Sequence, residues 1–150
     1  MPTPHKPTPA WQPIASLPIV APVIDGQLEA AEEQHRLLRL ARPGSLDNAT
    51  VERVVRVFTE EAELLAVYSE QLDQWRSGAL TAAQRLEVER LSGQLAHNRD
   101  VDAAILTLAE QLKATTIDAI LAKSDLELGF EVFTDRSPLF PRDLPRRSQP

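Results

Sequence analysis

The sequence predicts an all-α protein: an antiparallel three-helix bundle built on a long helical hairpin, with two short C-terminal helices and proline-rich extended termini. All twelve prolines of the 150-residue chain lie outside residues 44–137. The middle of the chain is therefore free to be helical and the two ends are not. Two seams of apolar residues at helical spacing run through residues 50–114, and each seam is interrupted by one polar residue.

Residues 50–114 form the predicted hairpin, with its turn at residues 77–81. Steps of three and four residues alternate along the first seam, as on one face of a helix; its members are Val51, Val54, Phe58, Glu61, Leu65, Tyr68, Leu72 and Trp75. The second seam consists of Val88, Leu91, Leu95, Asn98, Val101, Ile105, Leu108 and Leu112. Two consecutive three-residue steps at Asn98 predict local overwinding of the second helix.

The two seams also predict the register of the hairpin. Folding the chain about the turn pairs residues whose numbers sum to about 159, which places Phe58 opposite Val101. The same rule places Glu61 opposite Asn98. Because a carboxylate in an apolar seam is costly unless it is hydrogen-bonded, we expect these two residues to form a buried polar layer. Such layers fix the register of coiled coils.

The chain before the hairpin predicts an arm and a first helix. Residues 1–18 are proline-rich and should be extended, and Trp11 could attach this arm to the helical domain at residues 19–134. Proline suits the first position of a helix and glycine follows its end, so the first helix should run from near Pro22 to before Pro43. About 20 residues give a length of about 30 Å, against about 45 to 50 Å for each helix of the hairpin.

Capping patterns mark the starts of the later helices. Several candidate caps lie within residues 45–50, and Thr81 with Gln84 forms a capping box that opens the third helix. A second such pattern, Ser124 to Glu127, predicts two short helices at residues 117–123 and 125–133 with an elbow between them. Their apolar side chains should pack back on the bundle. Residues 135–150 form a proline-rich basic tail.

The short first helix has a consequence for the hairpin tip. If it covers only the far half of the hairpin, the apolar residues near the tip are bare. Either the arm, through Trp11, or a second molecule should then cover them, so we expect contacts at Trp75, Leu80 and Leu86 and a possible homodimer through the tip.

Net charge bears on the class of partner. Residues 19–134 carry 11 basic and 20 acidic side chains, and such an acidic body argues against direct nucleic-acid binding. Glu60, Glu61 and Glu63 lie on the first helix of the hairpin, with Glu87 and Glu89 on the second. This acidic cluster is either a solvated face or a surface that docks arginines in the manner of a nucleic-acid mimic.

The sequence lacks the residues that several kinds of catalytic or binding site require. The chain has no cysteine, which removes disulfides and thiolate chemistry, and its glycines are isolated, so no phosphate-binding loop is present. Glu32 and His35 have the spacing of carboxylate-bridged di-metal bundles, but the chain has no second such pair, and we expect no metal or cofactor. Without a targeting or membrane-length apolar segment, we expect a cytoplasmic protein.

Arg90 and His97 are two helical turns apart with six residues between them. This spacing resembles the arginine-to-histidine spacing of the all-helical HEPN ribonucleases, although Leu91 stands where that family has a polar residue. The resemblance implies a metal-independent ribonuclease with these two catalytic residues.

We therefore predict a non-catalytic helical protein-interaction module, such as an adaptor, inhibitor or accessory subunit, whose partner is another protein. A HEPN-like ribonuclease and an acidic, nucleic-acid-mimicking inhibitor are the two alternatives.

Overall fold

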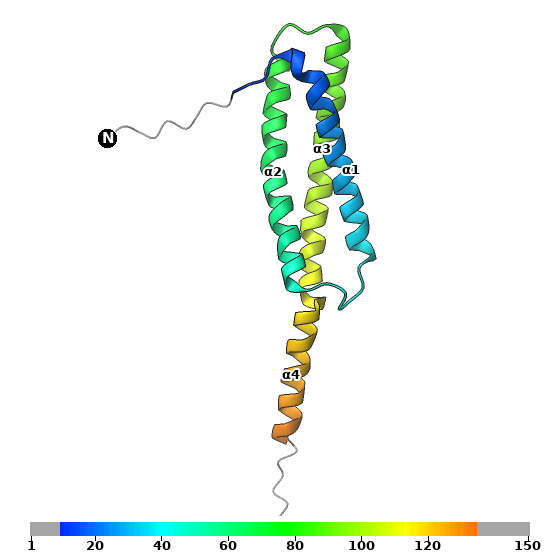
Figure 1. Cartoon of the computed structure of the whole chain (residues 1–150), viewed down its shortest axis with the longest axis vertical. Coiled ribbons are helices and arrows are strands. Elements are labelled where there is room, and N and C mark those ends of the chain that lie inside the picture. The colour runs from blue at the N-terminus through cyan, green and yellow to red at the C-terminus, as the bar shows by residue number, and fades with distance from the viewer. Residues whose placement is uncertain (1–9, 135–150) are drawn as a thin grey trace, which may run out of the picture.

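The structure is a computed structural model that describes the backbone of residues 10–134 and the side chains of residues 10–127. Its elements, in chain order, are η1 (Ile14–Ser16), α1 (Leu17–Leu40), α2 (Asn48–Arg76), α3 (Ala82–Leu112), η2 (Lys113–Thr115) and α4 (Ile117–Thr134) (Figure 1). The predicted all-helical class with three long helices is confirmed, and residues 10–134 contain no strand. The predicted tail, and the arm before residue 10, lie outside the described residues.

The three long helices, here called the body, lie side by side with α2 running opposite to α1 and α3 (Figure 1). Both α1 and α2 pack along α3, so α3 is their common partner. Two apolar clusters fill the interior. The tip cluster, near the α2 to α3 turn, contains Leu17, Ala21, Ile24, Leu65, Leu72, Trp75, Val88, Leu91 and Leu95. The base cluster, at the opposite end, contains Leu28, Ala31, Leu38, Phe58, Val101 and Ile105.

Local capping chemistry starts α2 and α3 close to the predicted positions. The backbone N–H of Thr50 donates to Asp47 Oδ1 over 2.8 Å at the start of α2. At the start of α3, Gln84 N–H donates to Thr81 Oγ1 (3.1 Å) and Thr81 N–H donates to Gln84 Oε1 (2.9 Å). Both bonds satisfy donors that have no partner inside the helix, so the predicted capping box at Thr81 is confirmed.

The predicted start of the first helix at Pro22 is wrong, because α1 begins at Leu17 and includes Pro22. Pro18 takes the favourable place in the first turn. At Pro22 the helix loses one backbone donor. The helix ends at Leu40, and its 24 residues carry it to the hairpin tip.

The expectation that the first helix stops short of the hairpin tip is wrong for the same reason. Trp75 is only 5% exposed, because the first turns of α1 pack on it in the tip cluster. The chain before α1 adds to this cover: Trp75 Nε1 donates to the backbone oxygen of Gln12 over 2.7 Å. The Gln12 N–H donates to Gln71 Oε1, also over 2.7 Å.

The two predicted short C-terminal helices are one continuous helix, α4. Ser124 lies in its interior, where good helix formers flank it and nothing ends the preceding helix, so its capping pattern has no helix start to cap. The prediction that this segment packs back on the body is also wrong. In Figure 1, α4 leaves the base and continues away from α1 and α2 along the long axis of the molecule.

Hydrogen bonds between the α1 to α2 loop and the α3 to α4 junction fix the direction of α4. Thr116 is fully buried; its hydroxyl donates to Asn48 Oδ1 (2.7 Å) and accepts from the Ala119 N–H (3.1 Å), which caps α4. Two backbone bonds complete this junction clamp, from Gly44 N–H to Thr115 O (2.7 Å) and from Ile117 N–H to Leu46 O (2.8 Å).

Gly44 is the position at which the junction clamp is most sensitive to substitution. It has a φ of 79°, and an added Cβ would lie 3.3 Å from Ile120 Cδ1. A side chain in this left-handed region costs about 1–2 kcal/mol. We therefore expect Gly44→Ala to lower the free energy of unfolding by about that amount, measured by urea denaturation.

Gly93 is the matched control because it lies inside α3 and an added Cβ would meet nothing within 4 Å. Gly93→Ala should raise the stability by roughly 0.5–1 kcal/mol. Equal effects of the two substitutions would contradict the role assigned to Gly44.

Candidate functional site

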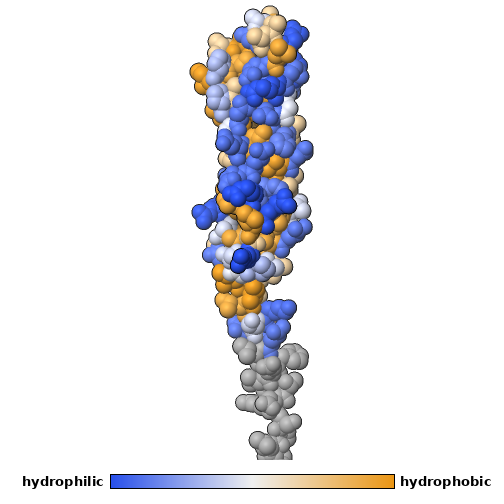
Figure 2. Space-filling model, turned by 90° about the vertical axis from the view of Figure 1, so that its right-hand side faces the viewer, coloured by the Kyte–Doolittle hydropathy of each residue, from blue (hydrophilic) through white to orange (hydrophobic). Residues whose placement is uncertain are grey.

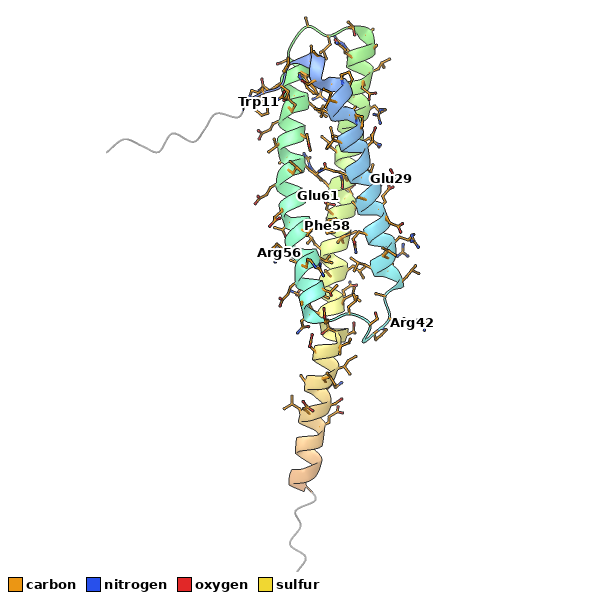
Figure 3. The ribbon with its side chains drawn as sticks, in the orientation of Figure 1. Trp11, Glu29, Arg42, Arg56, Phe58 and Glu61 are labelled. Atoms are coloured by element: carbon orange, nitrogen blue, oxygen red, sulfur yellow. The ribbon has the colours of Figure 1, made fainter. Side chains whose placement is uncertain are left out.

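A polar layer separates the tip cluster from the base cluster. It consists of Asn98 and Asp102, on successive turns of α3, together with Glu61 on α2. Asn98 and Asp102 are 0% and 2% exposed, and Glu61 is half-buried. Figure 3 shows Glu61 and Phe58 on the side of α2 that faces the other long helices, with Arg56 on the opposite side.

Asn98 connects the layer to α1 as well as to Asp102. In the amide orientation that satisfies both neighbours, its Nδ2 donates to Asp102 Oδ1 over 3.2 Å, and its Oδ1 accepts from the backbone N–H of Leu28 in α1 over 3.3 Å. Glu61, on α2, lies beside Asn98 at the same level of the body. One amide therefore links α1 to α3, and the structure brings Glu61 and Asn98 to one level, as the register rule places them.

The two carboxyl groups of the layer hold their protons more tightly than ordinary carboxyls. Burial, and secondarily the charge of Glu61, raises the pKa of Asp102 to about 7. Burial also raises the pKa of Glu61, and the hydrogen bond with Asn98 partly offsets this rise. Asp102 Oδ2 has no hydrogen-bond partner among the described residues. Loss of a proton from Asp102 is therefore disfavoured, because it leaves a poorly solvated charge in the core.

Sequence reasoning missed Asp102, although the heptad spacing contains it. Steps of four, three, four and three residues connect Leu91, Leu95, Asn98, Asp102 and Ile105 without interruption.

 The five residues lie on one helical face, and Val101, which the predicted seam contains in place of Asp102, is also buried in the base cluster. The overwinding expected at Asn98 stays a prediction. An acidic residue at a seam position was the signal available in the sequence.

Arg90 and His97 both pair with carboxylates of α1. Arg90 binds Asp25 through two bonds of 2.8 Å and also donates to Glu87, at 2.9 and 2.7 Å. The hydrogen bonds from Arg90 hold the pKa of Asp25 below its usual range. His97 Nε2 lies 2.8 Å from Glu32 Oε1.

The two pairs explain the spacing of Arg90 and His97. Asp25 and Arg90 are 65 residues apart in the chain, and so are Glu32 and His97. Because α1 and α3 run in the same direction, a step of two helical turns on α3 matches an equal step on α1. The spacing that resembles the HEPN ribonucleases therefore coincides with a repeated contact between two parallel helices.

The acidic residues singled out in the sequence fall into two groups. Glu60 and Glu63 are exposed on α2. On α3, Glu87 binds Arg90, and Glu89 accepts from Arg76 Nε over 2.9 Å. The α3 members are thus already engaged by arginines of this chain.

The Glu32 and His35 pair is also divided, since Glu32 pairs with His97 while His35 lines a surface hollow. Within the described residues, no group of three or more His, Asp or Glu side chains is arranged to hold a metal ion.

The apolar candidates are spread over the tip. Trp11 and Leu80 are half-buried, Trp75 is buried, and Leu86 is 73% exposed. Exposed apolar side chains that sequence reasoning assigned to the core also lie on α4. They are Ile117, Ile120, Leu121 and Leu126, which are between 41% and 74% exposed. Figure 2 shows hydrophobic surface where α4 leaves the body.

Comparisons of the chain with protein-family models, with curated proteins and with solved structures find no match. By length and composition alone, Ile14–Leu40 could cross a membrane. The same segment contributes six buried residues of α1 to the body, and both the core helix of a soluble protein and a signal sequence near the N-terminus meet the same criteria.

The raised pKa of Asp102 makes stability depend on pH. Between pH 3.8, the ordinary value, and about 7, the folded state binds a proton that the unfolded state releases, so stability falls as the pH rises through this window. In the wild type, this effect should lower the free energy of unfolding by roughly 2–4 kcal/mol across the window, and Asp102→Asn should abolish that decrease. Urea denaturation of both proteins at pH 4.5 and 7.5 measures the difference.

Asp100→Asn is the matched control, because Asp100 lies on α3 near Asp102 and is exposed. It should leave the pH dependence of the wild type in place. A wild type and an Asp102→Asn variant with parallel pH profiles would contradict a buried carboxyl in the layer.

Proposed function

We propose that the chain is a non-catalytic protein-interaction module, in which an antiparallel three-helix bundle holds α4 out as the contact surface for another protein. The observation that carries this proposal is the exposure of Ile117, Ile120, Leu121 and Leu126 on a helix whose start is fixed by the junction clamp. We place the protein in the cytoplasm as part of the same proposal.

The energetic argument concerns the cost of leaving these side chains in water. Complete burial of one large apolar side chain contributes roughly 1.5–3 kcal/mol, so the four exposed side chains of α4 offer a partner a substantial driving force. Ile117, Ile120 and Leu121 lie on one side of the helix, and contiguous exposed apolar surface marks interaction sites in soluble proteins. The clamp fixes the direction of α4 before binding, which reduces the ordering cost of association.

The pairing of Arg90 and His97 favours binding over ribonuclease chemistry. Each side chain is held by an α1 carboxylate, so both have a structural role in joining α1 to α3. A catalytic role would require them to leave these partners for an RNA phosphate, in a body whose net charge repels phosphate.

Capture of a partner from the native host tests the proposal. Leu126→Asp places a charge at a side chain that is 74% exposed, so the fold should survive and the partner should be lost. Leu86→Asp is the matched control, because Leu86 is 73% exposed on α3. Loss of the partner from the Leu86 variant alone would transfer the contact to the hairpin tip.

Two further readouts separate the alternatives. Capture through apolar α4 contacts should persist at high salt, whereas an acidic inhibitor would release a basic partner as salt screens the charges. RNA cleavage by the wild type that disappears in both Arg90→Ala and His97→Ala would establish the ribonuclease instead.

A further inference from the structure

A hollow of about 400 Å³ lies between α1 and α3 at the base of the body. Its α1 side is lined by His35 and Arg39, and its α3 side by Ala103, Ala104, Thr107, Leu108 and Gln111, of which the first three are small. Small side chains allow a helix to approach the backbone closely, and the arginine places a positive charge beside an apolar floor.

The exposed side chains of α4 do not lie on a single face. Ile117 and Leu126 are nine residues apart, which places them about half a turn from each other around the helix. A helix that is apolar on opposite sides is typical of one surrounded by other elements. Contact with one flat surface would cover Ile117, Ile120 and Leu121 but leave Leu126 exposed, whereas insertion between two helices covers Leu126 as well.

The hollow of the same chain is out of reach of α4. The junction clamp directs α4 away from the base (Figure 1), and folding it back would break the bonds of Thr116 and Gly44. The α4 of a second copy, oriented in the opposite direction, can reach the hollow without breaking these bonds. When two copies overlap base to base, each α4, about 27 Å long by the helical rise, runs along the base of the other.

Charge favours this arrangement over a pairing of two α4 helices. Residues 117–134 contain four acidic side chains and one lysine, so two α4 helices placed side by side repel each other. Asp125 follows Leu121 by one helical turn, and the hollow offers Arg39 as its partner. The acidic helix therefore fits the basic wall of the hollow better than it fits a copy of itself.

We propose that the chain forms a twofold-symmetric dimer in which α4 of each copy inserts into the α1 to α3 hollow of the other. This inference rests on the proposed function, because it identifies the protein that α4 contacts. A twofold axis makes both contacts identical and leaves no unmatched α4. It also moves the self-association expected at the hairpin tip to the opposite end of the molecule.

Cross-linking tests the contact directly, because the chain has no cysteine and introduced cysteines are unique. One copy carries Ala103→Cys in the hollow and the other carries Leu121→Cys on α4. Both residues are exposed. Mixing them with a short bismaleimide should give a covalent dimer of the two different variants. Leu86→Cys in place of Ala103→Cys, at the tip, should give none.

Light scattering tests the driving force on the full-length protein. The wild type should be a dimer and Leu121→Asp a monomer with an unchanged helical circular dichroism spectrum. Arg39→Asp and Asp125→Arg should each weaken the dimer by about threefold to tenfold, and combining them should restore it, as expected for a partly exposed ion pair.

Three outcomes would overturn the dimer. A covalent dimer of Leu121→Cys with itself, without the Ala103→Cys product, would show α4 paired with α4. A monomeric wild type that captures another protein through Leu126 would refute the dimer and leave the proposed function intact. A monomeric wild type whose captured partner is insensitive to Leu126→Asp would refute both.

Discussion

The placement of Asn98 and Asp102 on one face of α3 constrains the rest of the structure. Two apolar clusters can fill the body only if these polar side chains lie between them, at the level of Glu61 and the Leu28 backbone. Sliding α2 or α1 by one turn against α3 would place an amide or a carboxyl among leucines, at a cost of several kcal/mol for a buried polar group without a partner. The layer therefore defines one register among several that apolar packing alone would tolerate.

The surface pairs repeat the same register from outside. Asp25 with Arg90 and Glu32 with His97 share one offset along two parallel helices. Exposed pairs of this kind contribute little stability individually. They favour one register, because a shift of α1 by one turn would separate both pairs at once. The same shift would also break the hydrogen bond between the Leu28 backbone and Asn98 in the interior. Interior and surface thus select the same arrangement.

Local chemistry determined which structural features could be predicted. The capping box at Thr81 was predictable because its two bonds involve residues three apart, and the hairpin register followed from the polar residues Glu61 and Asn98. The start of α1 was not predictable, because Pro18 and Pro22 both suit a first turn and only the packing of Leu17 in the tip cluster decides between them. Asp102 was missed because the burial of an acidic residue depends on all three helices. The path of α4 depends on bonds from Thr116 and Gly44 across about 70 residues of chain, which no local pattern contains.

The exposed helix also gives the acidic composition a physical role. A chain that carries four large apolar side chains on a projecting helix risks nonspecific association whenever that helix is unoccupied. A net charge of −6 opposes such association, since like-charged molecules repel at the distances over which apolar surfaces meet. This repulsion acts whenever two copies meet. Arg39 in the hollow reduces the repulsion only when the acidic α4 of one copy is aligned with the hollow of the other. The same charges that disfavour random contact thus favour the one contact in which acidic helix and basic wall are matched.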